Sequence, residues 1–205
     1  MRFSLRSALS VALVLLAVGL ATGCRRLHRT DTTPLDQAGM WFNRIEELRA
    51  LDVTDAEVAE LVKVRSAGVS DGACVELVRL ARSRAQPFAG GDAIASLRQV
   101  GIGEPAILEL AKLNQLGLWV GEAQAMRLAG LSENVLLTLA RRRAAGQPAL
   151  SGPSVAQLKN SGLSEAQLLE LINRAATDEQ AAELVVARQR AANPTGFVRQ
   201  RGRRR

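Results

Sequence analysis

Basic side chains at the ends of regularly spaced segments are the groups of this sequence best placed to bind a partner. They are Arg82, Arg84, Lys112, Arg141, Arg142, Arg143 and Arg174. The interpretation we favour is that each cation compensates the negative end of a helix, an effect of about a few tenths of a kcal/mol. The alternative is that the segments stack in register and the cations form one basic ridge, which would dock an acidic partner.

Residue patterns that would support catalysis are missing. The sequence has no HExxH, GxSxG, Walker A or CxxC motif, and it contains only 2 Cys and 1 His. One His cannot form a His-based metal cluster, and two Cys cannot form a disulfide scaffold. Residues 101–106 fit GxGxxA, but a dinucleotide fingerprint follows a strand, and a helical pattern precedes this one. We therefore predict a protein that is not an enzyme and has no cofactor and no metal.

The turn at Gly101 to Gly103 suggests an alternative function. It lies between two apolar helical patterns and resembles the helix-hairpin-helix element, whose Gly-apolar-Gly turn offers backbone N–H groups to a nucleic-acid phosphate. The resemblance implies a nucleic-acid-binding module that uses this turn together with the basic ends. However, Glu104 places a negative charge where the phosphate would approach, so we do not expect nucleic acid as the main partner.

The segments that position these residues are repeated. The pattern Gly-apolar-(Ser/Gly)-acid begins at Gly68, Gly101, Gly130 and Gly162, at intervals of 33, 29 and 32 residues. Asp52-Val53-Thr54-Asp55 is interpreted as a degenerate copy in front of them. Intervals of this length are typical of helical repeats. The glycine suits the end of one helix, and the Ser and acid suit the beginning of the next.

Apolar residues recur with helical spacing on both sides of each turn. We expect helices near 41–51, 55–66, 71–84, 92–100, 104–115, 121–129, 133–145, 154–161, 165–175 and 178–191. Helices this short are not stable alone in water, so they must pack against each other. The sequence therefore predicts an all-α fold, an array of short helix-turn-helix repeats of about 32 residues.

The first 24 residues carry an export pattern. A basic head with Arg2 and Arg6 precedes an apolar run over residues 8–20, and small residues then lead to Cys24. This segment resembles the signal peptide and lipobox of bacterial lipoproteins. The resemblance implies cleavage before Cys24 and acylation of its thiol, which binds the protein to a membrane. An uncleaved membrane anchor and an ordinary cleaved signal stay open as alternatives.

The expected organisation has four parts. They are a signal peptide at 1–23, a lipidated Cys and flexible linker at 24–39, an all-α helical-repeat domain at 40–193, and a disordered Arg-rich tail at 194–205. The tail cations are Arg199, Arg201, Arg203, Arg204 and Arg205. Two interpretations stay open, which are contact with anionic lipid or an acidic partner or polymer, and a solvated tail without a function. Of the 27 basic residues, 17 lie between residues 30 and 198, against 20 acidic ones, so the net charge of +7 comes from the two ends.

Aromatic and thiol side chains give three further expectations. Trp41 and Phe42 are expected to pack at the end of the array, with a membrane-facing pair as the alternative. Trp119 is placed in a turn, and Cys74 is expected to be a small buried residue of the core.

We therefore expect an exported lipoprotein, anchored on the periplasmic or extracytoplasmic side of a membrane. By resemblance to the lipoprotein sorting pattern, Arg25 directly after Cys24 favours the outer membrane where one is present. The expected role is that of a non-catalytic interaction or scaffold protein of the bacterial cell envelope.

Overall fold

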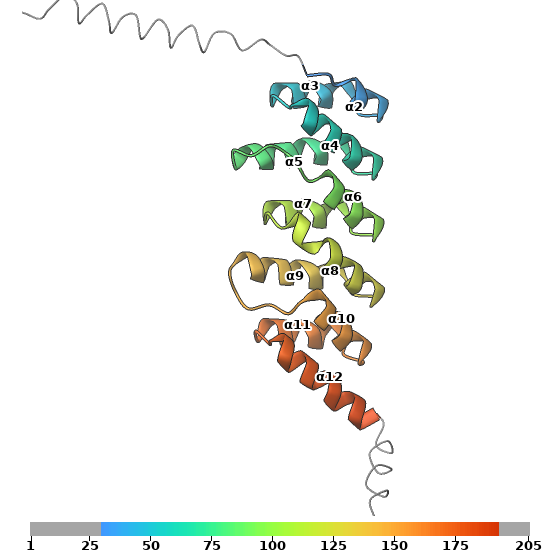
Figure 1. Ribbon diagram of the computed structural model, residues 1–205, viewed down its shortest axis with the longest axis vertical. Coiled ribbons are helices and arrows are strands. Elements are labelled where there is room, and N and C mark those ends of the chain that lie inside the picture. Colours follow the sequence, from blue (N-terminus) through green and yellow to red (C-terminus); the bar gives the residue numbers. More distant parts are fainter. Residues whose placement is uncertain (1–29, 193–205) are drawn as a thin grey trace, which may run out of the picture. The chain divides into compact units, whose positions relative to one another are not determined.

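The computed structural model describes residues 30–192, and within that range every regular element is a helix (Figure 1). A compact unit begins at Thr32. Its helices are α2 (Thr33–Gln37), α3 (Phe42–Ala50), α4 (Asp55–Ser66), α5 (Asp71–Ser83), α6 (Gly91–Gln99), α7 (Glu104–Lys112), α8 (Leu116–Leu128), α9 (Glu133–Ala144), α10 (Gly152–Asn160), α11 (Glu165–Asn173) and α12 (Asp178–Ala192). The expected all-α fold is confirmed for this part of the chain.

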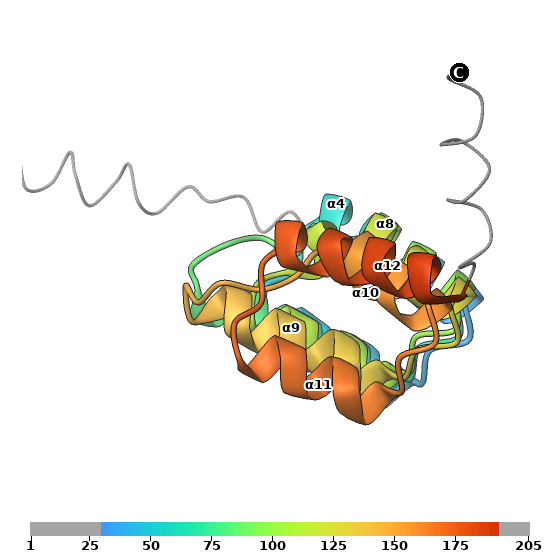
Figure 2. The same ribbon diagram turned by 90° about the horizontal axis from the view of Figure 1, so that it is seen from below.

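Even-numbered and odd-numbered helices form two layers. Each even helix packs on the next even helix, from α2 to α12, and each odd helix packs on the next odd helix, from α3 to α11. Figure 2 looks along the stack and shows α8, α10 and α12 in one layer and α9 and α11 in the other. Successive helix pairs therefore stack on each other in the order of the sequence.

Two kinds of turn connect the layers. A turn from an even to an odd helix contains a glycine with positive φ, followed by a buried apolar residue and then an extended residue at the N-cap position of the next helix. These glycines are Gly39, Gly68, Gly101, Gly130 and Gly162. A turn from an odd to an even helix has positive φ at Asp52, Ala85, Asn114, Gly146 or Ala175. Glycine suits the first kind because a left-handed conformation costs other residues roughly 1–2 kcal/mol.

The beginning of the fold differs from the sequence-based expectation. Residues 33–37 form α2, and its Leu35 is completely buried, so this stretch belongs to the packed unit and not to a flexible linker. Pro34 lies in the first turn of α2, a position where proline favours a helix start. The Asp52 turn joins α3 to α4 and is of the second kind, while Gly39 begins the additional turn of the first kind.

Helix α8 also differs from its expected position, because it begins at Leu116 and not near residue 121. The glycines at 117 and 121 lower helix propensity, which made this start hard to see in the sequence. Burial outweighs that propensity. Trp119 lies inside the helix, is completely buried, and donates a hydrogen bond from Nε1 to Gln115 Oε1 at 2.9 Å.

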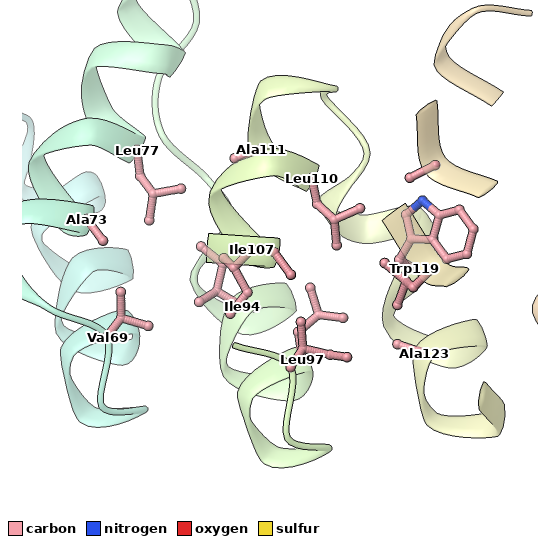
Figure 3. Close-up of a cluster of buried hydrophobic side chains, with 14 of the residues drawn as sticks. Val69, Ala73, Leu77, Ile94, Leu97, Ile107, Leu110, Ala111, Trp119 and Ala123 are labelled. Atoms are coloured by element: carbon pink, nitrogen blue, oxygen red, sulfur yellow. The ribbon is translucent and has the colours of Figure 1, made fainter. Parts of the chain in front are cut away.

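The core lies between the two layers. Figure 3 shows part of it, where Ile107 and Leu110 of the odd layer and Ile94 and Leu97 of the even layer point into the space between the two layers. Cys74 is completely buried in α5, as expected. In contrast, the expectation that Trp41 and Phe42 pack at the end of the array is wrong, because both side chains are exposed.

Candidate functional site

The seven basic residues of the expected ridge lie near the C-terminal ends of α5, α7, α9 and α11. These helices belong to one layer and pack on each other in sequence, so the ends that carry the cations lie along one edge of that layer. We call this set of seven residues the arginine edge. Cys24 and the five tail arginines from Arg199 to Arg205 lie outside the described residues.

Arg82 uses its guanidinium within the fold. Its Nη1 and Nη2 donate to the two carboxylate oxygens of Glu57 at 2.7 and 2.8 Å, and its Nε donates to the carbonyl oxygen of Leu51 at 3.0 Å. Glu57 is only 1% exposed. Arg82 therefore joins α5 to the beginning of α4 by a charge-assisted, bidentate contact.

The environment of Glu57 changes its proton affinity. Burial alone raises the pKa of a carboxyl group, but here the hydrogen bonds from Arg82 and from the backbone N–H groups of Phe88 and Thr54 outweigh it. The pKa of Glu57 falls from 4.5 to about 2. Glu57 is therefore ionised at neutral pH and holds three separate segments together.

Arg143 has an equivalent role in a later helix pair. Its Nη1 and Nη2 donate to Glu122 Oε1 and Oε2 at 2.7 and 2.8 Å, and Nη2 also donates to the carbonyl oxygen of Leu150 at 3.0 Å. The guanidinium carbon lies 4.4 Å from the centre of the Trp119 ring, a cation–π distance. The Arg143 side chain therefore stabilises the packing of α8, α9 and α10.

Arg84 caps the end of a neighbouring helix. Its Nη2 donates to the carbonyl oxygens of Ala111 and Lys112 at 2.7 and 2.9 Å, at the C-terminal end of α7. The final carbonyl groups of a helix have no partner within the helix and attract positive charge. Arg84 therefore compensates the negative end of a helix, as one of the two interpretations predicts. The helix is α7, and not α5, which Arg84 itself follows.

The remaining members of the arginine edge are more accessible. The Arg141 side chain is 55% exposed and contacts Glu109, and the Arg174 side chain is 72% exposed and contacts Glu170. Arg142 donates to the carbonyl oxygen of Pro148 at 3.1 Å, and Lys112 is exposed at the end of α7. Exposed ion pairs are weak and open readily. These four residues are the part of the edge that can bind an anion from solution.

An apolar hollow of about 270 Å³ adjoins the arginine edge. It lies among α5, α6, α7 and α8, and its lining includes Leu77, Phe88, Ala93 and Leu116. Arg84 belongs to both the lining and the edge. The hollow is large enough for an apolar side chain of a bound partner. It was not predictable from sequence periodicity, because its wall includes the irregular segment 86–90.

Acidic residues at helix starts make contacts that the sequence analysis missed. Glu104 accepts from the backbone N–H of Ser70 at 2.7 Å, and Glu133 and Glu165 accept in the same way from Gly103 and Ser132. Asp71 accepts from the N–H of Trp41 at 2.9 Å. Each acid thus caps the odd helix of the preceding pair as well as stabilising its own helix start.

A second row of cations was also missed. Arg65, Arg98 and Arg127 each stand three residues before a turn glycine, and each donates to the carbonyl oxygen four residues later, at Val69, Ile102 and Leu131. Arg98 also donates to the carbonyl oxygen of Ala67 in the preceding pair at 3.4 Å. The fixed position before each glycine was visible in the sequence and could have revealed this row.

A third contact joins some of the even helices. Eight residues before the turn glycine stand Glu60 in α4, Ala93 in α6 and Glu122 in α8. Glu60 accepts from the N–H of Gly91, and Glu122 from the N–H of Gly152, at the start of the next even helix. Ala93 has no carboxylate, so the corresponding hydrogen bond between α6 and α8 is missing.

The Gly101 to Gly103 turn has its backbone donors already engaged. The N–H groups of Gly101 and Ile102 donate to the carbonyl oxygens of Arg98 and Leu97, and that of Gly103 donates to Glu133 at 2.7 Å. A phosphate at this turn would have to displace a carboxylate. The geometry therefore gives no support to the nucleic-acid alternative.

Residues 30–192 contain no group of three or more His, Cys, Asp and Glu side chains arranged to hold a metal ion. Over the same range, no helix has both the length and the apolar character needed to cross a bilayer. The fold and the edge thus define an all-α protein of stacked helix pairs with a partly exposed basic border. No family model matches the sequence, and neither curated proteins nor solved structures give a match.

Proposed function

We propose that this protein is an exported, lipid-anchored, non-catalytic interaction or scaffold protein of the bacterial cell envelope. In this proposal, acylated Cys24 holds the protein on the extracytoplasmic side of a membrane, and the outer membrane is favoured where one is present. The arginine edge docks an acidic envelope protein or polymer. The tail arginines give a second contact with anionic lipid.

The observation that carries the docking proposal is the alignment of exposed and partly exposed cations along one edge. Lys112, Arg141, Arg142 and Arg174 come from three different helices that pack side by side. The adjoining hollow offers an apolar contact beside the charges. Stacked helices present extended surfaces that are well suited to binding other macromolecules.

We further propose that the helix pairs are tandem repeats of about 32 residues. The recurring contacts support this, because Ser70 to Glu104, Gly103 to Glu133 and Ser132 to Glu165 join residues 34, 30 and 33 positions apart. A repeated contact between neighbouring pairs is what a repeat architecture requires, since each unit is stabilised by the units beside it.

Labelling with radioactive palmitate tests the lipid anchor. The wild-type protein and a Cys24→Ala variant are compared, followed by separation of the membranes. We expect label in the wild type alone, and wild-type protein in the membrane fraction. Equal labelling of the two proteins, or unlabelled protein in the cytoplasm, would overturn the anchor.

Retention on immobilised polyglutamate at increasing salt tests the docking edge. The informative variant is Arg141→Gln/Arg142→Gln/Arg174→Gln, because Arg141 and Arg174 are exposed, Arg142 is partly exposed, and their loss leaves the Glu57 and Glu122 contacts intact. The three substitutions are made in a protein lacking residues 198–205, so that the tail arginines do not contribute. We expect the variant to elute at lower salt than the tail deletion without the substitutions, and equal elution of the two proteins would reject the edge.

A further inference from the structure

Trp41 and Phe42 form an exposed aromatic pair in the first helix pair of the described unit. Their exposed fractions are 77% and 71%. Trp41 is the residue that precedes α3, and Phe42 is the first residue of that helix. The backbone here is well held, because the Trp41 N–H donates to Asp71 at 2.9 Å and Met40 beside it is buried. The two rings thus project from a fixed base.

The positions that correspond to Trp41 and Phe42 hold small or acidic residues in every later turn from an even to an odd helix of the described unit. The pairs there are Ser70-Asp71, Gly103-Glu104, Ser132-Glu133 and Ser164-Glu165. In the first three of these turns, the acid reaches back to cap the odd helix of the preceding pair. The fourth acid, Glu165, does the same.

Helix α3 is the first odd helix of the described residues, so an acid at position 42 would have no helix of that layer before it to cap. The terminal unit of a stacked array ordinarily carries a polar outer surface, which keeps it soluble. In the first described helix pair, two large aromatic side chains are exposed instead, and Trp41 lies beside Arg44 and Asp71. Such an arrangement stabilises the protein only if something apolar or interfacial covers the pair.

The length of the preceding chain indicates which surface that is. Cys24 precedes Thr32, where the packed unit begins, by eight residues, which reach at most about 30 Å when fully extended. A bilayer that holds an acylated Cys24 is therefore always within reach of the first helix pair. Trp and other aromatic side chains favour the boundary between headgroups and acyl chains.

The charges beside the pair are compatible with such a surface. Asp71 is paired with Arg65 at 2.9 Å, and Glu47 contacts both Arg44 and Arg79. The nearby carboxylates are thus neutralised by cations within the fold. This lowers the cost of bringing them close to lipid headgroups, including anionic ones.

We propose that Trp41 and Phe42 insert into the interfacial layer of the bilayer that holds acylated Cys24, and so orient the helix stack on the membrane. The proposal rests on the lipid anchor of the proposed function. The pair is a further attachment point, and its position on the folded unit gives the helix stack a defined orientation on the membrane.

Tryptophan fluorescence tests the proposal directly, because the chain has 2 Trp and no Tyr. The full lipidated protein is reconstituted into phosphatidylcholine vesicles with ordinary or brominated acyl chains. Trp119 is buried in the core and gives a constant background, which is measured in a Trp41→Phe variant. We expect brominated lipid to quench at least about half of the Trp41 emission. On vesicles this emission should also lie at shorter wavelength than when the protein is in solution without vesicles or detergent.

The outcomes separate this inference from the anchor. One outcome would overturn the inference and leave the anchor intact. In that outcome the protein is labelled with palmitate and bound to vesicles, but its Trp41 emission is insensitive to brominated lipid and is quenched by iodide. Protein without palmitate label that does not float with the vesicles would overturn the anchor, and the inference would fall with it. A Phe42→Ser variant, still lipidated, should show weaker quenching of Trp41 than the wild type.

Discussion

The carboxylate of Glu133 accepts a hydrogen bond from the backbone N–H of Gly103 at 2.7 Å, across 30 residues of sequence. Glu133 begins α9, and Gly103 directly precedes α7, so one side chain serves the starts of two helices. The first N–H groups of a helix have no partner within the helix. Glu133 thus stabilises the start of α9 and also accepts a hydrogen bond from a backbone N–H at the start of α7.

The equivalent acid Glu104 can be tested by substitution. It accepts from both the N–H and the hydroxyl of Ser70, at 2.7 and 2.8 Å. We expect Glu104→Ala to lower the free energy of unfolding by about 1–2 kcal/mol, because hydrogen bonds to a charged acceptor are lost. Urea denaturation measures the change. Glu183→Ala on the exposed face of α12 is the matched control and should stay within about 0.5 kcal/mol of the wild type.

Arg82→Met should destabilise the protein much more strongly. The substitution preserves bulk but leaves the buried carboxylate of Glu57 without its ionic partner. Removing one member of a buried pair typically costs about 3–5 kcal/mol. Arg174→Met, at a side chain that is 72% exposed, should change stability by no more than about 0.5 kcal/mol. Similar unfolding midpoints for the two variants would contradict the structural role of Arg82.

Acid should weaken the fold through Glu57. Its pKa is lowered from 4.5 to about 2 in the folded protein, so the folded state favours the ionised form. The resulting stabilisation is present above pH 4.5 and is lost as the pH falls through 4.5 towards 2, with a total of about 3 kcal/mol. Unfolding followed between pH 7 and pH 2 measures it. The Glu57→Gln variant should lack this part of the pH dependence, and a slope equal to the wild type would refute the assignment.

The thiol of Cys74 should be unreactive in the folded protein. Desolvation by burial raises its pKa to about 12, so almost no thiolate exists at pH 8. In a Cys24→Ser protein, where Cys74 is the remaining cysteine of the 2 in the chain, Ellman's reagent should react slowly. Reaction should become fast in concentrated guanidinium chloride. Rapid reaction without denaturant would show that α5 opens readily.

Two glycine substitutions should have opposite effects. A Cβ added at Gly152 would lie 2.6 Å from the Glu122 Cβ and 3.0 Å from its carbonyl oxygen, so Gly152→Ala should destabilise the protein by about 1–3 kcal/mol. Gly121 lies inside α8 with nothing within 4 Å of an added Cβ. Gly121→Ala should therefore stabilise the helix by about 0.5–1 kcal/mol. Thermal unfolding distinguishes the two directions.

Helix positions were largely predictable because the residues that end one helix and begin the next lie close together in the sequence. The glycines at 68, 101, 130 and 162 lie in the left-handed conformation, and the helices after them begin at the acids the sequence marked. The short α2 was not predictable, since its five residues become helical only by burying Leu35 against the stack. The start of α8 was missed for a similar reason, because burial of Trp119 outweighs two nearby glycines.

The role of the basic residues was only partly predictable. Their place at helix ends follows from the sequence, but the carboxylate partners of Arg82, Arg141 and Arg143 lie 21 to 32 residues away and depend on how the pairs stack. The sequence alone therefore does not distinguish Arg82 and Arg143 from the exposed Arg174, although each forms a bidentate contact with a carboxylate inside the stack. Only the stacking reveals which cations are free to meet a partner.

Neighbouring even helices are not all joined by the same contacts. The hydrogen bonds of Glu60 with Gly91 and of Glu122 with Gly152 have no counterpart between α6 and α8, where Ala93 lines an open hollow instead. We expect small bending motions to be larger at the α6–α8 junction than at the α4–α6 and α8–α10 junctions, because this hydrogen bond is missing there. In the proposed scaffold role, such motion would let the protein stay bound to two components whose separation fluctuates.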